Sequence, residues 1–178
     1  MIRLFAAVAI PPDLADELTR RQHGIPEARW RPPDSLHITL RFFGEIPEEQ
    51  AADLDAELAR VAERPFELSL RGAGAFGEGL DVRAVWAGVG ESEPLKRLAA
   101  KCESAARRSG LEAEKRPYRP HVTLAYTRRP DPARVAAWIA QHNLLKTPPF
   151  LVTWFGLWSS ITHREGSRYD LQREYPLA

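Results

Sequence analysis

Two short stretches of the sequence each place a histidine two residues before a threonine. They are "SLHITLRFFGE", with His37 and Thr39, and "RPHVTLAYT", with His121 and Thr123. Alternate side chains of a β-strand point to the same face, so each histidine shares a face with its threonine while the residues between them enter the core. One such tripeptide is an ordinary feature of a half-exposed strand. Two copies with the same apolar flanks, 84 positions apart, indicate a shared chemical task.

Two histidines and two hydroxyls around one point suit displacement at a phosphorus centre. Histidine exchanges protons near neutral pH, so a neutral and a protonated imidazole supply a base to the attacking oxygen and an acid to the leaving oxygen. Threonine hydroxyls donate hydrogen bonds to the remaining phosphate oxygens as charge develops. The set is a poor metal site, because no carboxylate or third histidine lies at ligand spacing. We therefore expect no metal and no other cofactor.

The composition limits the kinds of partner. The net charge is only +1 over 178 residues, whereas proteins that grip a long duplex usually carry a strong basic excess, so any nucleic acid is expected to be engaged over a few nucleotides. No apolar run reaches the length of a membrane span. The single cysteine, Cys102, excludes an internal disulfide and is expected to be an inert thiol in a reducing cytoplasm.

The elements that must position the motifs follow from periodicity and from helix start and stop signals. Strands are expected at residues 2–10, 36–43, 66–77, 82–90, 121–127, 150–161 and 167–177, and helices at 11–22, 47–64, 92–110 and 131–143. The stretch 28–35 is expected to be irregular because of its prolines. The remaining histidines, His23, His142 and His163, fall at helix ends or in loops and are expected on the surface.

Each histidine strand is preceded by proline and followed by a helix, so the two halves of the chain look like duplicated units. Such a duplication of strands and helices predicts two lobes that are related by an approximate two-fold axis and meet at a cleft. We expect residues 1–178 to form one bilobal domain.

The motifs also carry a family resemblance. "HITLRFFGE" and "RPYRPHVTLAY" resemble the paired H-x-T-x signatures of the two-histidine phosphoesterases. "RLFAAVAIP", "RWRPPDSLHITLRFFGEI" and "SRYDLQREYPL" resemble the RNA 2′,3′-cyclic phosphodiesterase branch, also described as 2′-5′ RNA ligase-like. The resemblance implies a bilobal α+β fold of two antiparallel sheets with outer helices around a central cleft. It also implies metal-independent hydrolysis of a terminal 2′,3′-cyclic phosphate to a 2′-phosphate. It makes His37 the general acid and His121 the general base, with Thr39 and Thr123 holding the phosphate.

In one position the chain departs from this pattern. Members of the family often carry an arginine three residues after the second threonine, where this chain has Tyr126. Arg128 or Arg129 could supply the missing charge, and Arg41 shares a face with His37 by simple alternation. Aromatic side chains near the motifs could stack on a base, namely Phe42, Tyr118 and Tyr126. Tyr169 is expected at the border of the cleft, and Trp86, Trp154 and Trp158 are assigned to packing.

Three functions remain open at this point. The first is hydrolysis of cyclic phosphates at RNA 3′ ends or in small cyclic nucleotides, by a monomer without an obligate protein partner. The second uses the same catalytic pair for reversible 2′-5′ ligation or cleavage of 2′-5′ linkages. The third is a non-catalytic module that binds RNA ends. The presence of both intact H-x-T pairs argues against the module, which would need charge more than titratable groups.

Overall fold

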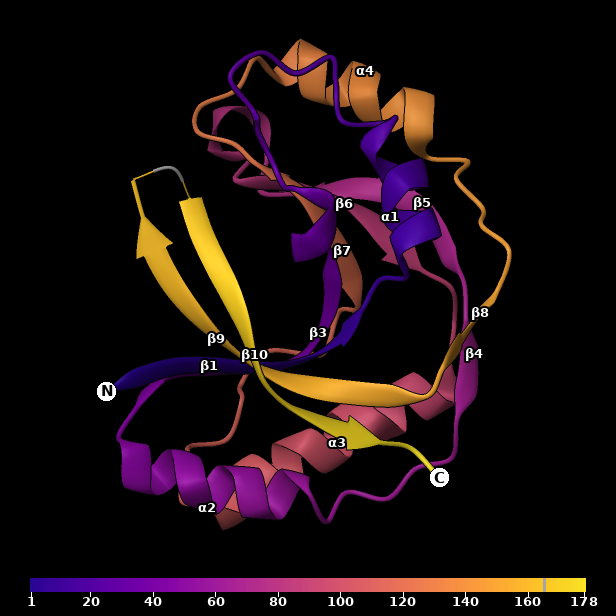
Figure 1. Cartoon of the computed structure of the whole chain (residues 1–178). Helices are drawn as coiled ribbons and strands as arrows, with labels where there is room; N and C mark the ends of the chain where they lie inside the picture. Colours follow the sequence, from indigo (N-terminus) through magenta and orange to yellow (C-terminus); the bar gives the residue numbers. More distant parts are fainter. Residues whose placement is uncertain (165) are drawn as a thin grey trace.

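The structure is a computed structural model that describes residues 1–164 and 166–178. The helices within these residues are α1 (Pro12–Thr19), η1 (Pro33–Ser35), α2 (Glu48–Leu58), η2 (Gly79–Asp81), α3 (Glu93–Arg108) and α4 (Pro132–His142) (Figure 1). The strands are β1 (Ile2–Ala9), β2 (Arg29–Trp30), β3 (His37–Ile46), β4 (Phe66–Leu68), β5 (Leu70–Phe76), β6 (Ala84–Val89), β7 (His121–Tyr126), β8 (Phe150–Val152), β9 (Trp154–His163) and β10 (Gly166–Pro176).

The strands form one large sheet with two halves and one small sheet. The large sheet has the order β10-β9-β1-β3-β7-β6-β5, with β2 added to β7, and β4 pairs with β8 in the small sheet. Every strand pair is antiparallel. The halves meet between β3 and β7, where the paired residues are Ile38 and Val122. Helices α2 and α3 cover the first half and α4 lies over the second, which confirms the expected α+β fold with outer helices (Figure 1).

The strand register carries the duplication that the motifs indicate. The pairing of β1 with β3 recurs residue for residue in the pairing of β6 with β7, including the position of an irregularity in the ladder. The matching pairs are Phe5–Phe42 with Ala84–Tyr126, Ala6–Arg41 with Val85–Ala125, Ala7–Thr39 with Trp86–Thr123, Val8–Ile38 with Ala87–Val122, and Ala9–His37 with Gly88–His121. The two lobes therefore present their motifs in equivalent geometry.

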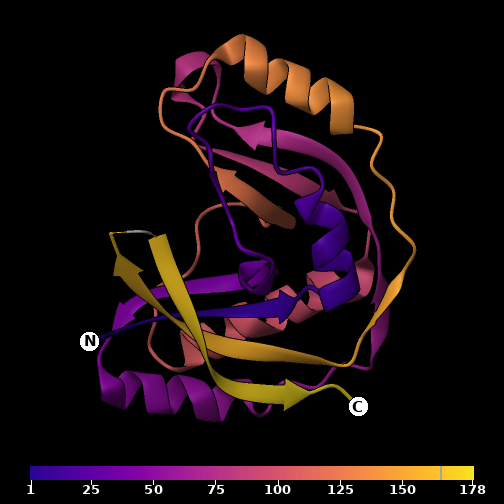
Figure 2. The same cartoon turned by 45° about the horizontal axis from the view of Figure 1, so that its top comes forward.

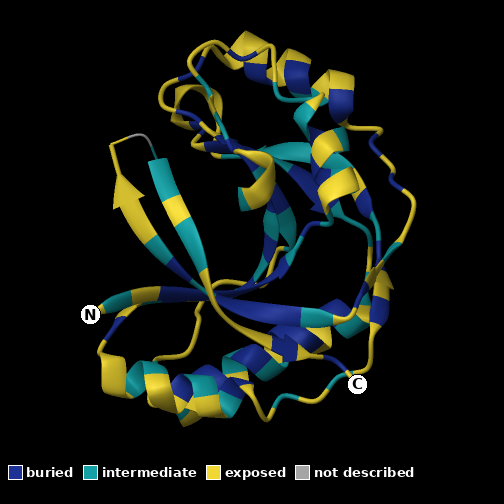
Figure 3. Cartoon of the chain, in the orientation of Figure 1, coloured by how far each residue is buried: buried dark blue, intermediate teal, exposed yellow. Residues whose placement is uncertain are grey.

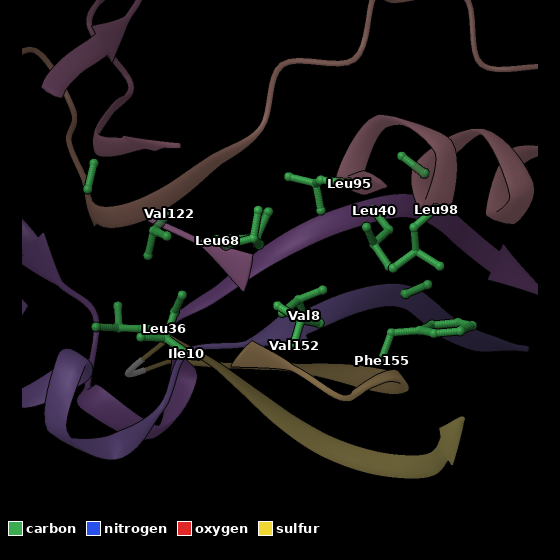
Figure 4. Close-up of a cluster of buried hydrophobic side chains, with 14 of the residues drawn as sticks. Val8, Ile10, Leu36, Leu40, Leu68, Leu95, Leu98, Val122, Val152 and Phe155 are labelled. Atoms are coloured by element: carbon green, nitrogen blue, oxygen red, sulfur yellow. The ribbon is translucent and has the colours of Figure 1, made fainter. Parts of the chain in front are cut away.

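A single buried cluster runs beneath both motifs. Val8, Leu40 and Val122 belong to it together with residues of α3, β4, β8 and β9 (Figure 4). Buried positions follow the central strands and the inward sides of the helices, whereas the hairpin of β9 and β10 is exposed toward its tip (Figure 3). The apolar residues between the histidines and threonines thus anchor each motif strand from below.

Three expectations need correction. The expected strands 66–77 and 150–161 each divide in two, because the chain passes from the small sheet to the large one at Ser69 and at Thr153. Periodicity cannot reveal such a change of partner strand. The stretch 28–35, expected to be irregular, contributes the short strand β2 and the turn η1. His142 is 5% exposed rather than a surface residue. Among the described residues, no helix has the length and apolar character needed to cross a membrane.

Candidate active site

The four motif residues lie on one face at the junction of the two half-sheets. Ile38 stands opposite Val122 in an antiparallel pair, so the register brings His37 toward Thr123 and His121 toward Thr39. Ile38 and Val122 are fully buried, whereas the histidines and threonines are partly exposed. We call the side of the large sheet that carries these four residues the histidine face.

Both imidazoles are held by the same backbone contact. The Nδ1 atom of His37 lies 2.7 Å from the carbonyl oxygen of Ser35, and that of His121 lies 2.7 Å from the carbonyl oxygen of Arg119. A carbonyl oxygen can only accept, so Nδ1 carries the proton in each ring. The Nε2 atom of each neutral histidine is therefore a proton acceptor, and it becomes a donor when the ring is protonated.

Aromatic side chains fix the orientation of both rings. The ring of His37 lies 4.8 Å from that of Phe5 and edge-on to Tyr169 at 5.3 Å. His121 meets Phe76 edge-on at 4.7 Å and Trp86 at 6.3 Å. Trp86, expected only to pack, thus also contacts the ring of His121. Sequence periodicity identified these aromatic residues as strand residues without indicating that they surround the histidines.

The environment favours the neutral form of both histidines. Burial lowers the pKa of His37 to about 4, the hydrogen bond to Ser35 opposes this, and the charges of Arg31 and His121 lower it further. Burial also lowers the pKa of His121, the hydrogen bond to the Arg119 carbonyl opposes this, and the charge of Arg119 lowers it further. Because the charge of His121 lowers the pKa of His37, a second proton on the pair is disfavoured.

The threonine hydroxyls are available to a ligand. Thr39 and Thr123 are partly exposed, and the side-chain hydrogen bonds within residues 1–164 and 166–178 leave the Oγ1 atoms of both residues unused. The Thr39 carbonyl accepts a hydrogen bond from the Tyr118 hydroxyl at 2.9 Å, so Tyr118 fastens the segment before β7 to β3.

Arg41 does not lie on the histidine face. The ladder between β1 and β3 shifts between Ala6 and Ala7, so Arg41 pairs with Ala6 and turns to the opposite side, toward α3. There its guanidinium forms an ion pair with Glu103 and donates to the Glu112 carbonyl at 2.7 Å. The expectation from simple alternation is therefore wrong for Arg41, because a β-bulge reverses the alternation.

This shift in the β1–β3 ladder and the equivalent shift in the β6–β7 ladder bring Phe42 and Tyr126 to equivalent positions on the histidine face. Each is 38% exposed, and each has a guanidinium over its ring, that of Arg3 at 5.1 Å from Phe42 and that of Arg31 at 5.8 Å from Tyr126. Arg128 lies in the exposed loop after β7, and within residues 1–164 and 166–178 it forms no side-chain hydrogen bond or ion pair.

A cavity adjoins His37. Its volume is about 620 Å³, and it is lined by the segment 29–35, the end of β9 and the start of β10. Figure 2 shows how the hairpin of β9 and β10 projects from the large sheet. Arg29, Trp30, Arg31, Ser35, Arg168 and Tyr169 are among its lining residues. Ser35 and Tyr169 both contact His37, which links the cavity to the histidine face. Within residues 1–164 and 166–178, no three His, Cys, Asp or Glu side chains gather as a metal-ligand set.

Known proteins share this sequence and arrangement. The family model of the 2′-5′ RNA ligase superfamily matches residues 10–164. The chain belongs to the 2′-5′ RNA ligase superfamily. The RNA 2′,3′-cyclic phosphodiesterase of Escherichia coli is 32% identical over 98% of this chain and 96% of its own length. That of Thermus thermophilus is 38% identical over 74% of this chain and 71% of its own.

Solved structures of the superfamily agree with the fold. A structure from Thermus thermophilus superposes with a TM-score of 0.82 at 28% identity, covering 98% of this chain and 97% of the other. LigT of Escherichia coli complexed with 3′-AMP has a TM-score of 0.76 at 31% identity, covering 99% and 98% of the two chains. This superfamily member therefore keeps the overall arrangement of its relatives over nearly its whole length.

Proposed function

We propose that this protein hydrolyses 2′,3′-cyclic phosphates at RNA 3′ ends or in small cyclic nucleotides and leaves a 2′-phosphate. The observation that carries the proposal is the symmetric pair of histidines, whose Nδ1 protons are both held by carbonyl oxygens so that both Nε2 atoms are available. The names of the curated relatives support the substrate class.

In this proposal His121 accepts a proton from the attacking water, whose oxygen forms the new bond to phosphorus. The bond from phosphorus to the 3′ oxygen breaks, and His37 donates its proton to that oxygen, which leaves a 3′ hydroxyl and a 2′-phosphate. The hydroxyls of Thr39 and Thr123 donate hydrogen bonds to the non-bridging oxygens. The two histidines end the cycle with exchanged protonation states, which proton exchange with water resets.

The acid role of His37 requires that substrate binding change its protonation. With a pKa of about 4, His37 is neutral in the empty site at pH 7. A bound phosphodiester brings a negative charge beside His37 and Arg31, and an opposite charge nearby favours protonated histidine. Binding of the substrate thus favours the protonation state that the leaving oxygen requires.

The test is turnover of 2′,3′-cyclic AMP by purified protein in the presence of EDTA. We expect 2′-AMP as the product, and a loss of kcat of at least ~10²-fold in His37→Ala and in His121→Ala, the lower range for a positioned acid or base. His23→Ala, which changes an exposed histidine that does not line the cavity, is the matched control and should be unaffected. Binding without turnover would indicate a non-catalytic module, and activity abolished by EDTA would contradict the metal-independent mechanism.

The remaining features of the proposal concern the whole chain. We propose that residues 1–178 work as one bilobal, monomeric domain, and the single buried cluster beneath both motifs supports this. A cytoplasmic location is consistent with the buried free thiol of Cys102.

A further inference from the structure

Arg31 is a buried cation beside the second motif. Its residue is 9% exposed, and it directly follows β2. Its backbone N–H donates to the carbonyl oxygen of Leu124 at 2.8 Å, while Arg29 pairs with Tyr126 in the β2–β7 ladder. The backbone of Arg31 is thus fixed against the strand that carries His121 and Thr123.

The guanidinium of Arg31 is held among aromatic rings. Its Cζ atom lies 5.3 Å from the ring centre of Tyr169 and 5.8 Å from that of Tyr126. Its Nη2 atom donates to the Ser167 carbonyl at 3.1 Å, which uses one of the five N–H donors of a guanidinium. Two aromatic contacts and a backbone hydrogen bond orient the group, and no carboxylate within residues 1–164 and 166–178 forms an ion pair with it.

This charge stands next to the proposed acid. Tyr169 contacts the ring of His37 edge-on and the guanidinium of Arg31, so it lies between the two groups. The charge of Arg31 also lowers the pKa of His37. Arg41, by contrast, is paired with Glu103 on the other side of the sheet.

We propose that Arg31 binds the phosphate that is hydrolysed, through guanidinium donors directed from the residue after β2 onto the histidine face. This inference rests on the proposed function. Removing the charge of Arg31 from water costs free energy in the empty site. A bound phosphate pairs with that charge, so part of the free energy of phosphate binding comes from offsetting this desolvation cost. The planar fork of an arginine also matches two phosphate oxygens at once.

The test compares Arg31→Met, which keeps the aliphatic stem between the tyrosine rings, with Arg31→Lys, which restores a positive charge. Arg134→Met removes one charge from an exposed position of α4 and is the matched control. The measurements are the dissociation constant of inorganic phosphate by calorimetry, the KM and kcat for 2′,3′-cyclic AMP and for a dinucleotide ending in a cyclic phosphate, and the melting temperature.

We expect Arg31→Met to weaken phosphate binding and to raise the KM for both substrates by the same factor, roughly tenfold to 100-fold, the range of a charged hydrogen bond. Arg31→Lys should recover part of the phosphate affinity, and Arg134→Met should match the wild type. Unchanged phosphate affinity in Arg31→Met would overturn the proposal.

Two further outcomes separate the alternatives. A rise in KM confined to the dinucleotide would place Arg31 at a neighbouring phosphate and overturn the assignment. Equal losses of phosphate affinity in Arg31→Met and Arg31→Lys, with equal falls in melting temperature, would show a structural role and would also overturn it. If the wild type binds phosphate but turns over neither substrate, the proposed function fails, and the comparison of phosphate affinities alone decides the role of Arg31.

Discussion

His37 and His121 hold their Nδ1 protons in the same way but meet different charges. Arg31 and His121 act on His37, whereas Arg119 acts on His121. The hydrogen bonds therefore make the two imidazoles interchangeable in geometry, and only the surrounding charges can divide the roles of acid and base. Catalysis needs one protonated and one neutral histidine, so the reactive form of the free protein carries a single proton on the pair. A second proton is disfavoured, and the single proton can reside on either ring.

The pH dependence of kcat/KM follows from these shifts. Both folded pKa values lie below the ordinary value of 6.5, that of His37 at about 4. The singly protonated pair is therefore most abundant below pH 6.5, and kcat/KM should fall by about tenfold per pH unit above the higher pKa of the pair. The measurement is kcat/KM for 2′,3′-cyclic AMP from about pH 4 to pH 8. An optimum above pH 7 would contradict the lowered pKa values.

The contribution of the threonine hydroxyls to catalysis can be measured separately from the preference of threonine for a strand. Valine keeps the branched β-carbon that favours a strand while removing the hydroxyl. Thr39→Val and Thr123→Val should keep the wild-type melting temperature yet lose roughly 1–3 kcal/mol of transition-state stabilisation each, the range for a hydrogen bond to a charged group. Both quantities should be measured on both variants. Full activity in the two variants would show that the phosphate is held by other groups.

At the scale of the elements, the sequence predicts strands and helices well and fails where a ladder changes register or partner. The strand with His37 and the one with His121 are placed correctly because alternation of two residues is the direct signal of a strand. Arg41 is misplaced because a β-bulge needs two strands in register, which alternation along one strand cannot show. The splits at Ser69 and Thr153 are missed for the same reason.

The candidate site is predictable only in part. The histidine and threonine pairs stand out because their residue types and repetition carry a chemical meaning. Arg31 is missed because it lies in a proline-rich stretch where no periodicity applies, and its importance depends on Tyr126 and Tyr169, which lie far away in the sequence. Its one sequence signal is a cation placed just before the first motif strand.

At the scale of the whole molecule, the two lobes are joined through a narrow seam but share one core. The pairing of β3 with β7 is limited to Ile38 and Val122, yet both residues belong to the buried cluster that also includes α3 and the small sheet. The relative placement of the two histidines therefore depends on packing across the molecule. Changes in global stability should disturb catalysis even when they arise far from the histidine face.

His142 is such a distant site. It ends α4 against the ring of Trp138, at 5.0 Å, and its Nδ1 atom lies 3.0 Å from the Nη1 atom of Arg21. A guanidinium only donates, so Nδ1 must accept and the ring must be neutral. Burial, and then the charges of Arg21 and His23, lower the pKa of His142 below 6.5. Protonation would set one N–H group against another in the buried contact between α4 and the segment after α1.

The free energy of unfolding should consequently fall as the pH drops below 6.5. The pKa values of His37, His121 and His142 are all lowered by folding, so the unfolded chain binds more protons in that range, and each such group contributes at most about 1.4 kcal/mol per pH unit. Urea unfolding at pH 5, 6 and 7 measures the slope. His142→Gln, whose amide oxygen can still accept from Arg21, should give a shallower slope than the wild type, whereas His163→Gln, at an exposed site, should leave it unchanged. Equal slopes for the wild type and His142→Gln would show that His142 takes up its proton without disturbing the contact between α4 and Arg21.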